Sequence, residues 1–175
     1  MFKSIMFIFL YLVSQMVSAL DYTHEITEQG IQEKLSALMP IVKKKYFVTI
    51  TILNPKIDLI KKSDEIGILA EIKANVTGGI KGKGEVMIKG TLAYNANKGE
   101  FYFKNPKIVS LAIDKVPDNI IPKIQGVAQA ALSKVMTVYP VYKFKDDNLT
   151  HTLAKSVLKS LKVENERLLL TLGVF

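Results

Sequence analysis

The chain has 175 residues, a formal net charge of +8, two histidines and no cysteine. A chain of this length can bury the core of one domain without covalent staples, and the lack of cysteine argues against disulfides, thiolate catalysis, cysteine metal sites and a lipid anchor on a cysteine. We expect no cofactor and no metal, and the scattered lysines favour transient contact with an anionic membrane surface over nucleic acid, although they are also typical of an ordinary solvated surface.

The first nineteen residues have the pattern of an export signal. Lys3 gives a positive start, Ile5 to Val13 form an apolar run, and Val17-Ser18-Ala19 supplies the small residues that precede a cleavage site. The run is much shorter than the roughly 20 residues that a membrane-spanning helix needs. We therefore expect a signal peptide at residues 1–19, cleaved after Ala19, and a single periplasmic domain at residues 20–175. An uncleaved signal would instead leave the protein associated with the membrane.

The first predicted element of this domain is a helix that begins with Thr27 as its N-cap and ends before Pro40, with Ile31 and Leu35 at helical spacing. The hydrophobic period then changes to two, which predicts strands. They span residues 46–53, 57–61, 65–76, 85–95 and 100–113, with a break at Asn54-Pro55 and a bulge at Asn105-Pro106. The glycine-rich segment 78–84 is predicted to be a flexible connection.

The second half of the domain is predicted to be mainly helical. Pro117 to Val138 carry a broad apolar stripe and form the longest helix, in which the missing side chain of Gly126 suggests close packing. A short extended piece, a third helix and a final strand follow at residues 140–144, 148–160 and 162–174. No internal repeat is evident along the chain.

A run of strands followed by helices is typical of the α+β class. We predict a curved antiparallel sheet wrapped on the long helix of the C-terminal half, with a further helix at the N-terminus. A long apolar helix after a meander of strands would pack into the concave face of the sheet. Small or flexible residues on that helix would leave room between the two layers.

Three patterns that can carry catalysis are weak in this chain. Gly82-Lys83 is followed by Gly84 and a strand pattern, so it lacks the hydroxyl and the helix of a phosphate-binding loop. His24 and His151 have no Gly-x-Ser-x-Gly elbow to partner them, and the neighbouring acids occur at turns, where such residues have local structural roles. We therefore predict that the protein is not an enzyme. A hydrolase that uses His151 with an Asp or Ser is the remaining catalytic alternative.

The apolar stripe of the long helix is the main candidate for a binding site. Its ordinary role is to cover the core, but a helix and a curved sheet can also enclose a cavity for acyl chains. The residues predicted to line such a cavity are Ile121, Ile124, Val127, Ala128, Ala131, Leu132 and Val135 from the helix and Ile50, Ile68, Ile72 and Leu92 from the strands.

Several segments together resemble one bacterial family. They are Ile26-Thr27-Glu28-Gln29, segments between Gly90 and Ile108, Pro140-Val141-Tyr142-Lys143-Phe144, and the strand from Val163 to Leu172. On these segments the chain is similar to the YceB-like envelope lipoproteins, a group defined by a domain of unknown function. The resemblance implies a periplasmic-side domain with a TULIP-like half module, a lipid-binding fold, and no catalysis. Members usually carry a lipobox cysteine, which this chain lacks.

The sequence therefore predicts a non-enzymatic periplasmic protein that binds a hydrophobic ligand, an acyl chain or phospholipid, between the long helix and the sheet. A cleaved form would be free to diffuse between membranes, which suits a carrier. The alternative is an envelope interaction protein with a filled core, which would bind a protein partner through an edge strand or its basic surface.

Overall fold

The computed structural model describes residues 21–60, 65–144, 156–165 and 167–174. The predicted signal peptide and His151 lie outside these residues. Strands take 62% of the described residues and helices 21%, so the molecule is mostly β. The predicted α+β class is therefore wrong, chiefly because stretches expected to be loop or helix are parts of long strands.

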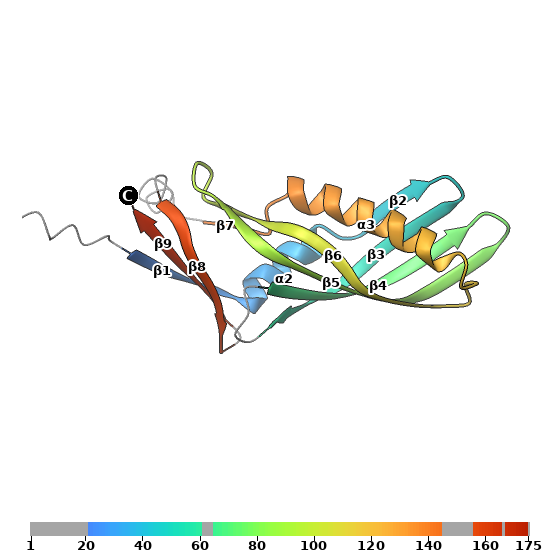
Figure 1. The fold of residues 1–175 in the computed structure, drawn as a ribbon, viewed down its shortest axis with the longest axis horizontal. Coiled ribbons are helices and arrows are strands. Elements are labelled where there is room, and N and C mark those ends of the chain that lie inside the picture. The colour runs from blue at the N-terminus through green and yellow to red at the C-terminus, as the bar shows by residue number, and fades with distance from the viewer. Residues whose placement is uncertain (1–20, 61–64, 145–155, 166, 175) are drawn as a thin grey trace, which may run out of the picture.

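The described part of the chain forms two antiparallel sheets and two helices. In chain order the elements are β1 Asp21–Thr27, α2 Glu28–Ala37, β2 Ile41–Lys45, β3 Val48–Leu59, β4 Glu65–Val76, β5 Ile80–Asn95, β6 Glu100–Asp114, α3 Ile121–Val138, β7 Tyr142–Lys143, β8 Ser156–Glu164 and β9 Arg167–Val174. One sheet has three strands in the order β1-β9-β8, and the other has six in the order β2-β3-β4-β5-β6-β7. The two sheets follow one another along an elongated molecule (Figure 1).

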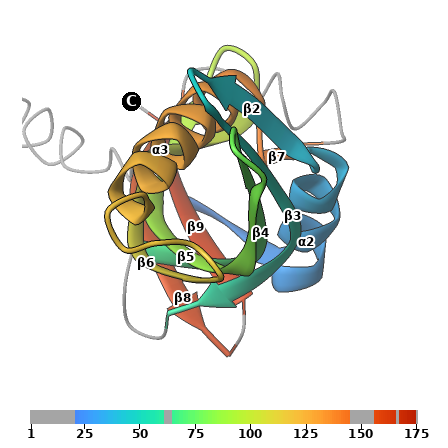
Figure 2. The ribbon, with the colours of Figure 1, turned by 90° about the vertical axis from the view of Figure 1, so that its right-hand side faces the viewer.

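The long helix α3 forms one wall of the domain. Viewed along the long axis, the six-stranded sheet curls, and α3 lies across the opening between β2 and β6 (Figure 2). It contacts β6 on one side and β2 and β3 on the other. Its buried face consists of Ile124, Val127, Ala128, Ala131, Leu132 and Met136. Its opposite face is exposed at Lys123, Gln125 and Lys134. The helix therefore covers one side of the core and is not enclosed by the sheet, so the prediction of a curved sheet wrapped on a long helix is wrong.

The N-terminal helix α2 forms as predicted. Thr27 Oγ1 accepts a hydrogen bond from the Gly30 N–H at 3.2 Å and so caps the helix. Ile31 and Leu35 are buried in the core, and the helix ends at Ala37. The strand β1 directly before it is not evident in the sequence, because its pairing partner β9 lies at the far end of the chain.

Strand β3 differs from its prediction at both ends. It begins at Val48, two residues later than predicted, because Tyr46 and Phe47 form a two-residue turn between β2 and β3. At the other end, Asn54-Pro55 does not break the strand: the pairing register with β4 shifts there and β3 continues to Leu59. The strand predicted at 57–61 is thus the second half of β3.

The glycine-rich segment 78–84 is a turn followed by a strand. Gly78 and Gly79 have φ of 101° and 88° in the turn, and β5 begins directly after them at Ile80. Within β5, a Cβ on Gly84 would lie 1.9 Å from the carbonyl oxygen of Ala112. Glycine is therefore needed where β6 closely approaches β5, and the expected flexible connection is wrong for this part of the segment.

The predicted third helix at 148–160 is wrong over its described part. Residues 156–164 form β8, which pairs with β9 so that Val157 lies opposite Gly173 and Leu161 opposite Leu170. The single strand predicted at 162–174 accordingly corresponds to two strands, the end of β8 and the whole of β9. Pairing along β9 outweighs the helical spacing of the apolar residues, as tertiary context often does for short segments.

An aromatic cluster joins the two sheets. His24 of β1 lies against Tyr142 of β7 and Phe144, and both of these contact Phe101 of β6, with ring centroids 4.8 to 6.2 Å apart. Phe101 is fully buried and Phe144 nearly so. Edge-to-face contacts at these distances add to the area that the rings bury, so the cluster stabilises the position of the small sheet on the large one.

Candidate functional site

All but one of the residues predicted to line a cavity meet in the core between α3 and the six-stranded sheet. Those at most 7% exposed are Ile50, Ile68, Ile72 and Leu92 from the strands and Ile124, Val127, Ala128, Ala131 and Leu132 from α3. Ile121 and Val135 are partly exposed. All but Ile121 belong to the packed core or lie against it. Of this predicted set, Val127 is the member that lines a pocket described below.

A surface pocket opens where α3 meets the β2–β3 hairpin. It has a volume of about 340 Å³ and is lined by Lys45, Tyr46, Phe47, Val48, Lys123, Gly126 and Val127; we call it the α3 pocket. Val48 and Val127 are 2% and 6% exposed, so the floor of the pocket is the edge of the hydrophobic core. Its size falls at the lower end of small-molecule sites, which occupy roughly 300–1,000 Å³.

Two lysines and two aromatic rings form the rim of the α3 pocket. The Lys123 ammonium lies 5.1 Å from the centroid of the Phe47 ring, and the Lys45 ammonium lies 5.4 Å from that of Tyr46. Cation–π contacts at this range hold a positive charge next to an apolar surface. The arrangement suits a ligand with an apolar body and an anionic end.

At Gly126, α3 lines the pocket with backbone alone, because glycine has no side chain. A Cβ on this residue would meet no atom within 4 Å, so the expectation of close packing at Gly126 is wrong. Glycine inside a helix costs about 1 kcal/mol relative to alanine, and no close backbone approach requires it here. Its consequence is open space on the helix surface between Lys123 and Val127.

On its other side, α3 is fixed to β6 by the side chain of Gln129. The Gln129 Oε1 accepts a hydrogen bond from the Ile108 N–H at 2.9 Å, and its Nε2 donates to the Pro106 carbonyl at 2.5 Å and to Ser133 Oγ at 3.1 Å. Asn105-Pro106 bulges out of the regular β5–β6 ladder, and the amide satisfies backbone groups that the bulge exposes. The helix is thus held by polar contacts on the β6 side, whereas on the β2 side the α3 pocket lies between it and the hairpin.

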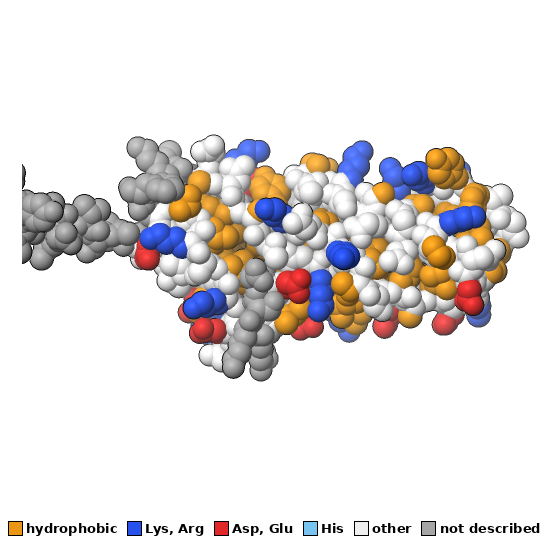
Figure 3. All heavy atoms as spheres, viewed as in Figure 1, with side chains coloured by type: hydrophobic (Ala, Val, Ile, Leu, Met, Phe, Trp, Pro, Cys, Tyr) orange, Lys and Arg blue, Asp and Glu red, His pale blue; other side chains and the backbone are white. Residues whose placement is uncertain are grey.

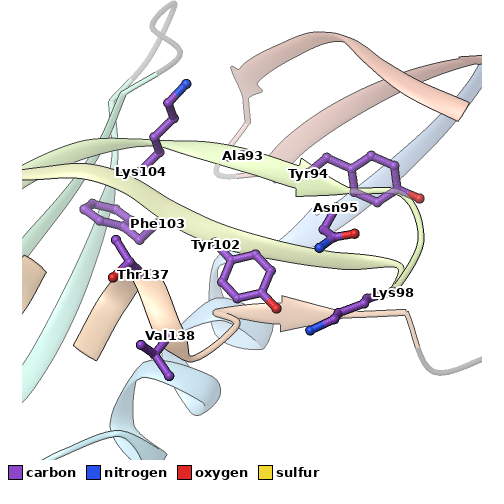
Figure 4. Close-up of a pocket in the computed structure, with 9 residues that line it drawn as sticks. All are labelled: Ala93, Tyr94, Asn95, Lys98, Tyr102, Phe103, Lys104, Thr137 and Val138. Carbon is purple, nitrogen blue, oxygen red and sulfur yellow. The ribbon is translucent and has the colours of Figure 1, made fainter. Parts of the chain in front are cut away.

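A larger pocket, of about 550 Å³, lies at the C-terminal end of α3 beside the β5–β6 turn, lined by the residues drawn in Figure 4. There the Lys104 side chain points away from Thr137 and Val138. The Tyr102 hydroxyl donates to Glu100, which raises the pKa of Tyr102, and Glu100 pairs with Lys143 at 3.5 Å. Because the Tyr102 hydroxyl is already bonded to Glu100 and the lining is more polar than that of the α3 pocket, this pocket is the weaker candidate for an apolar ligand.

The residue types of catalytic and metal sites are dispersed in the described part of the chain. His24 Nε2 lies 3.0 Å from the Tyr142 hydroxyl, and partial burial lowers the pKa of His24, an effect that the charge of Glu25 partly opposes. No group of three or more His, Asp or Glu side chains among the described residues could hold a metal ion. Within the same residues, no helix is long and apolar enough to cross a membrane. The hydrolase centre suggested at His151 lies outside them.

Sequence reasoning found Val127 but missed the rim of the α3 pocket. It treated Tyr46 and Phe47 as the start of a strand, because their two-residue turn lacks the Gly, Asn or Asp that usually marks a hairpin. The available signal was the run Lys43-Lys44-Lys45 directly before two aromatic residues. Such an abrupt change from charged to aromatic residues is not typical of one continuous, half-buried strand.

A sequence profile of a known family covers most of this chain. Residues 26–167 match the profile described as a protein of unknown function, DUF1439. The chain belongs to the DUF1439 family. The expectation of a domain-of-unknown-function family is confirmed at this level, while the YceB-like name stays a prediction. No curated protein matches this DUF1439 chain.

Among solved structures, the DUF1439 chain is similar to one described as a lipopolysaccharide binding protein. The TM-score is 0.31 at 13% sequence identity, and the similarity covers 86% of this chain and 40% of the other. The DUF1439 chain therefore spans less than half the length of that protein.

Proposed function

We propose that this DUF1439 protein binds a hydrophobic ligand, an acyl chain or phospholipid with an anionic head group, in the α3 pocket between the long helix and the sheet. The observation that carries the proposal is the combination of an apolar floor, Val48 and Val127, with Lys45 and Lys123 at the rim. The apolar chain would lie against the floor and gain about 25 cal/mol for each Å² of apolar surface removed from water. The head group would pair with the two ammonium groups, which orient it.

Ile124 and Ala128, which neighbour the floor of the α3 pocket along α3, are aliphatic and fully buried in the packed core. A longer acyl chain would therefore have to displace core side chains to extend inward from the pocket. On the β6 side Gln129 fixes α3 through backbone hydrogen bonds, whereas on the β2 side the helix faces Phe47 through Lys123. We therefore propose that the acyl chain of the ligand enters between α3 and the β2–β3 hairpin.

We propose a binding role and not a catalytic one. The titratable groups of the α3 pocket are two lysines and one tyrosine, whereas covalent catalysis needs a nucleophile activated by an adjacent base or by a lowered pKa. We also propose that the protein works in the periplasm, on the strength of the export-signal pattern in residues 1–19.

Titration of the protein with cis-parinaric acid, a fluorescent fatty acid, tests the proposal. We expect saturable binding by the wild type and at least tenfold weaker binding by Gly126→Leu, because the new side chain enters the pocket. Gln125→Leu is the matched control: it adds the same side chain on the neighbouring exposed position, which does not line the pocket. Native mass spectrometry of protein purified from the periplasm would identify any co-purifying lipid.

Two results would contradict the proposal. One is a wild type that neither binds the probe nor carries a lipid. The other is a pair of leucine variants that bind the probe as well as the wild type does, because the ligand would then lie elsewhere. Gly126→Leu should not unfold the protein, since leucine is the better helix former and the space beside it is open.

One observation favours the alternative of an interaction protein. Strand β8 is an edge of the three-stranded sheet, and its Val157 is 39% exposed. An extended segment of a partner could add to such an edge through main-chain hydrogen bonds. Crosslinking in cells from a photoreactive residue at position 157 to one protein, together with a lipid-free wild type in the mass spectrum, would support this alternative.

A further inference from the structure

The tip of the β2–β3 hairpin carries an aromatic residue that the fold does not require. Tyr46 has φ of 53°, in the left-handed region that glycine adopts freely and bulky residues rarely do. Its side chain is 82% exposed, so burial in the core does not offset the unfavourable backbone conformation. A residue held in such a conformation at an exposed tip is a candidate for a role in binding.

A groove rich in lysine lies on the neighbouring strands. It has a volume of about 430 Å³ and is lined by Lys73, Asn75, Lys81, Gly82, Lys83, Asp114 and Lys115. The register places Lys73 of β4 directly opposite Lys83 of β5, and like charges in this position destabilise a sheet. Four lysines against one aspartate leave the groove positive, which suits an anionic partner. These lysines are scattered in the sequence and come together only through strand pairing.

The aromatic tip and the lysine groove occupy the same end of the molecule. The Thr77 N–H, in the turn between β4 and β5, donates a hydrogen bond to the Phe47 carbonyl at 2.9 Å, which joins the two hairpin tips. Both tips lie at the end farthest from the three-stranded sheet (Figure 1). Hydrophobic and basic side chains lie side by side on the visible surface there (Figure 3). We call the Tyr46–Phe47 tip and the lysine groove together the hairpin end.

We infer that the hairpin end docks on a lipid bilayer rich in anionic phospholipid. Tyrosine favours the head-group level of a membrane, where its ring is in apolar surroundings and its hydroxyl in water. Lysines beside it are attracted to anionic lipids over about a Debye length. Docking by this end would bring the mouth of the α3 pocket, which Tyr46 and Phe47 line, to the membrane surface. The docking does not depend on ligand binding in that pocket.

Co-sedimentation with sucrose-loaded vesicles tests this inference. We expect the wild type to bind vesicles of equal parts phosphatidylglycerol and phosphatidylcholine at least tenfold more strongly than pure phosphatidylcholine vesicles, with binding weakened by salt. Tyr46→Gly should bind at least fivefold more weakly while its unfolding temperature stays the same or rises, because glycine relieves the turn. Tyr139→Ser is the matched control, since Tyr139 is 53% exposed at the opposite end of α3.

The lysine groove is tested by charge changes of equal size. Lys73→Gln combined with Lys83→Gln should weaken vesicle binding at least fivefold, whereas Lys104→Gln combined with Lys107→Gln, on exposed positions of β6, should leave it within twofold. Failure of the wild type to bind phosphatidylglycerol vesicles would overturn the inference, and so would equal losses in the two lysine pairs. Displacement from vesicles by inorganic phosphate, but not by sodium chloride of equal ionic strength, would also overturn it, because the groove would then hold a free anion.

Docking and ligand binding can fail separately. The Lys73/Lys83 variant should still bind cis-parinaric acid in solution, since neither residue lines the α3 pocket. Gly126→Leu should bind vesicles as the wild type does, since the hairpin end is intact. Loss of vesicle binding in Gly126→Leu would contradict independent docking.

Discussion

Gln32 and Gln129 make the same pair of backbone hydrogen bonds in opposite halves of the six-stranded sheet. Gln32 of α2 accepts from the Ile57 N–H at 2.9 Å and donates to the Pro55 carbonyl at 2.5 Å. Gln129 of α3 does the same with Ile108 and Pro106, at 2.9 and 2.5 Å. Each amide also donates to the serine one helical turn later, at 3.1 Å.

The two halves share a short sequence pattern, so the prediction of a chain without an internal repeat is wrong. Asn-Pro-Lys-Ile occurs at 54–57 in β3 and at 105–108 in β6, and the two asparagines have φ of 49° and 52°. After each helix, a proline leads to an edge strand of the sheet, β2 in one half and β7 in the other. The fold therefore contains an approximate internal symmetry about the β4–β5 pair.

Removing the Gln129 amide should destabilise the protein. Gln129→Leu keeps the approximate volume but leaves the Pro106 carbonyl and the Ile108 N–H, both in part-buried hydrogen bonds, without their partner. Unsatisfied groups of this kind cost about 1–3 kcal/mol, measurable by urea unfolding. Gln125→Leu on the exposed side of α3 should change the free energy of unfolding by less than about 0.5 kcal/mol. Equal stability of the two variants would show that water replaces the amide.

Gln32→Leu should have a similar effect, because its bonds have the same lengths. The strands that the two glutamines contact, β3 and β6, are separated by β4 and β5 in the sheet. The double variant should therefore lose the sum of the two single losses to within about 0.5 kcal/mol. A much smaller loss in the double variant would mean that the two sites are coupled through the core.

The glutamine bridges also explain why strand boundaries were misplaced in the sequence analysis. Asn54-Pro55 has the composition typical of a strand end. The strand β3 continues past it because Gln32, from α2, bonds the Pro55 carbonyl and the Ile57 N–H. The pairing that makes β8 a strand comes from β9. Long-range contacts of this kind leave no mark in the local hydrophobic period.

Local signals were sufficient where an element depends on its own residues. The strand predicted at 65–76 has those bounds, because its apolar residues alternate without interruption. The cap at Thr27 and the apolar stripe of α3 were also predicted. The rim of the α3 pocket was not predicted, because it lies on a two-residue turn that contains no glycine. The lysine groove was not predicted, because three different strands contribute residues to it.

Gly126→Ala should stabilise the protein. The new methyl group meets no atom within 4 Å, and alanine in a helix interior is favoured over glycine by about 0.5–1 kcal/mol. The free energy of unfolding in urea should rise by that amount while binding of cis-parinaric acid changes less than in Gly126→Leu. A loss of stability would show that the helix depends on a backbone geometry that only glycine provides.

Stability should fall in mildly acid solution because of His24. Partial burial lowers the pKa of this imidazole in the folded state, the neighbouring Glu25 charge partly opposes that shift, and Nε2 contacts the Tyr142 hydroxyl at 3.0 Å. The unfolded chain, with a histidine pKa of 6.5, therefore takes up a proton first as the pH falls. The stabilisation is complete above pH 6.5 and is lost progressively as the pH drops towards the lower pKa of the folded state.

The comparison that isolates this effect is the wild type with His24→Gln, unfolded in urea at pH 7.5 and at pH 5.5. The wild type should lose more stability between the two values, since glutamine does not titrate. Tyr142→Phe keeps the imidazole and should retain a pH dependence, which separates the titration of His24 from the loss of its hydrogen bond. If the wild type and His24→Gln show the same pH dependence, the titration of His24 does not account for the loss of stability.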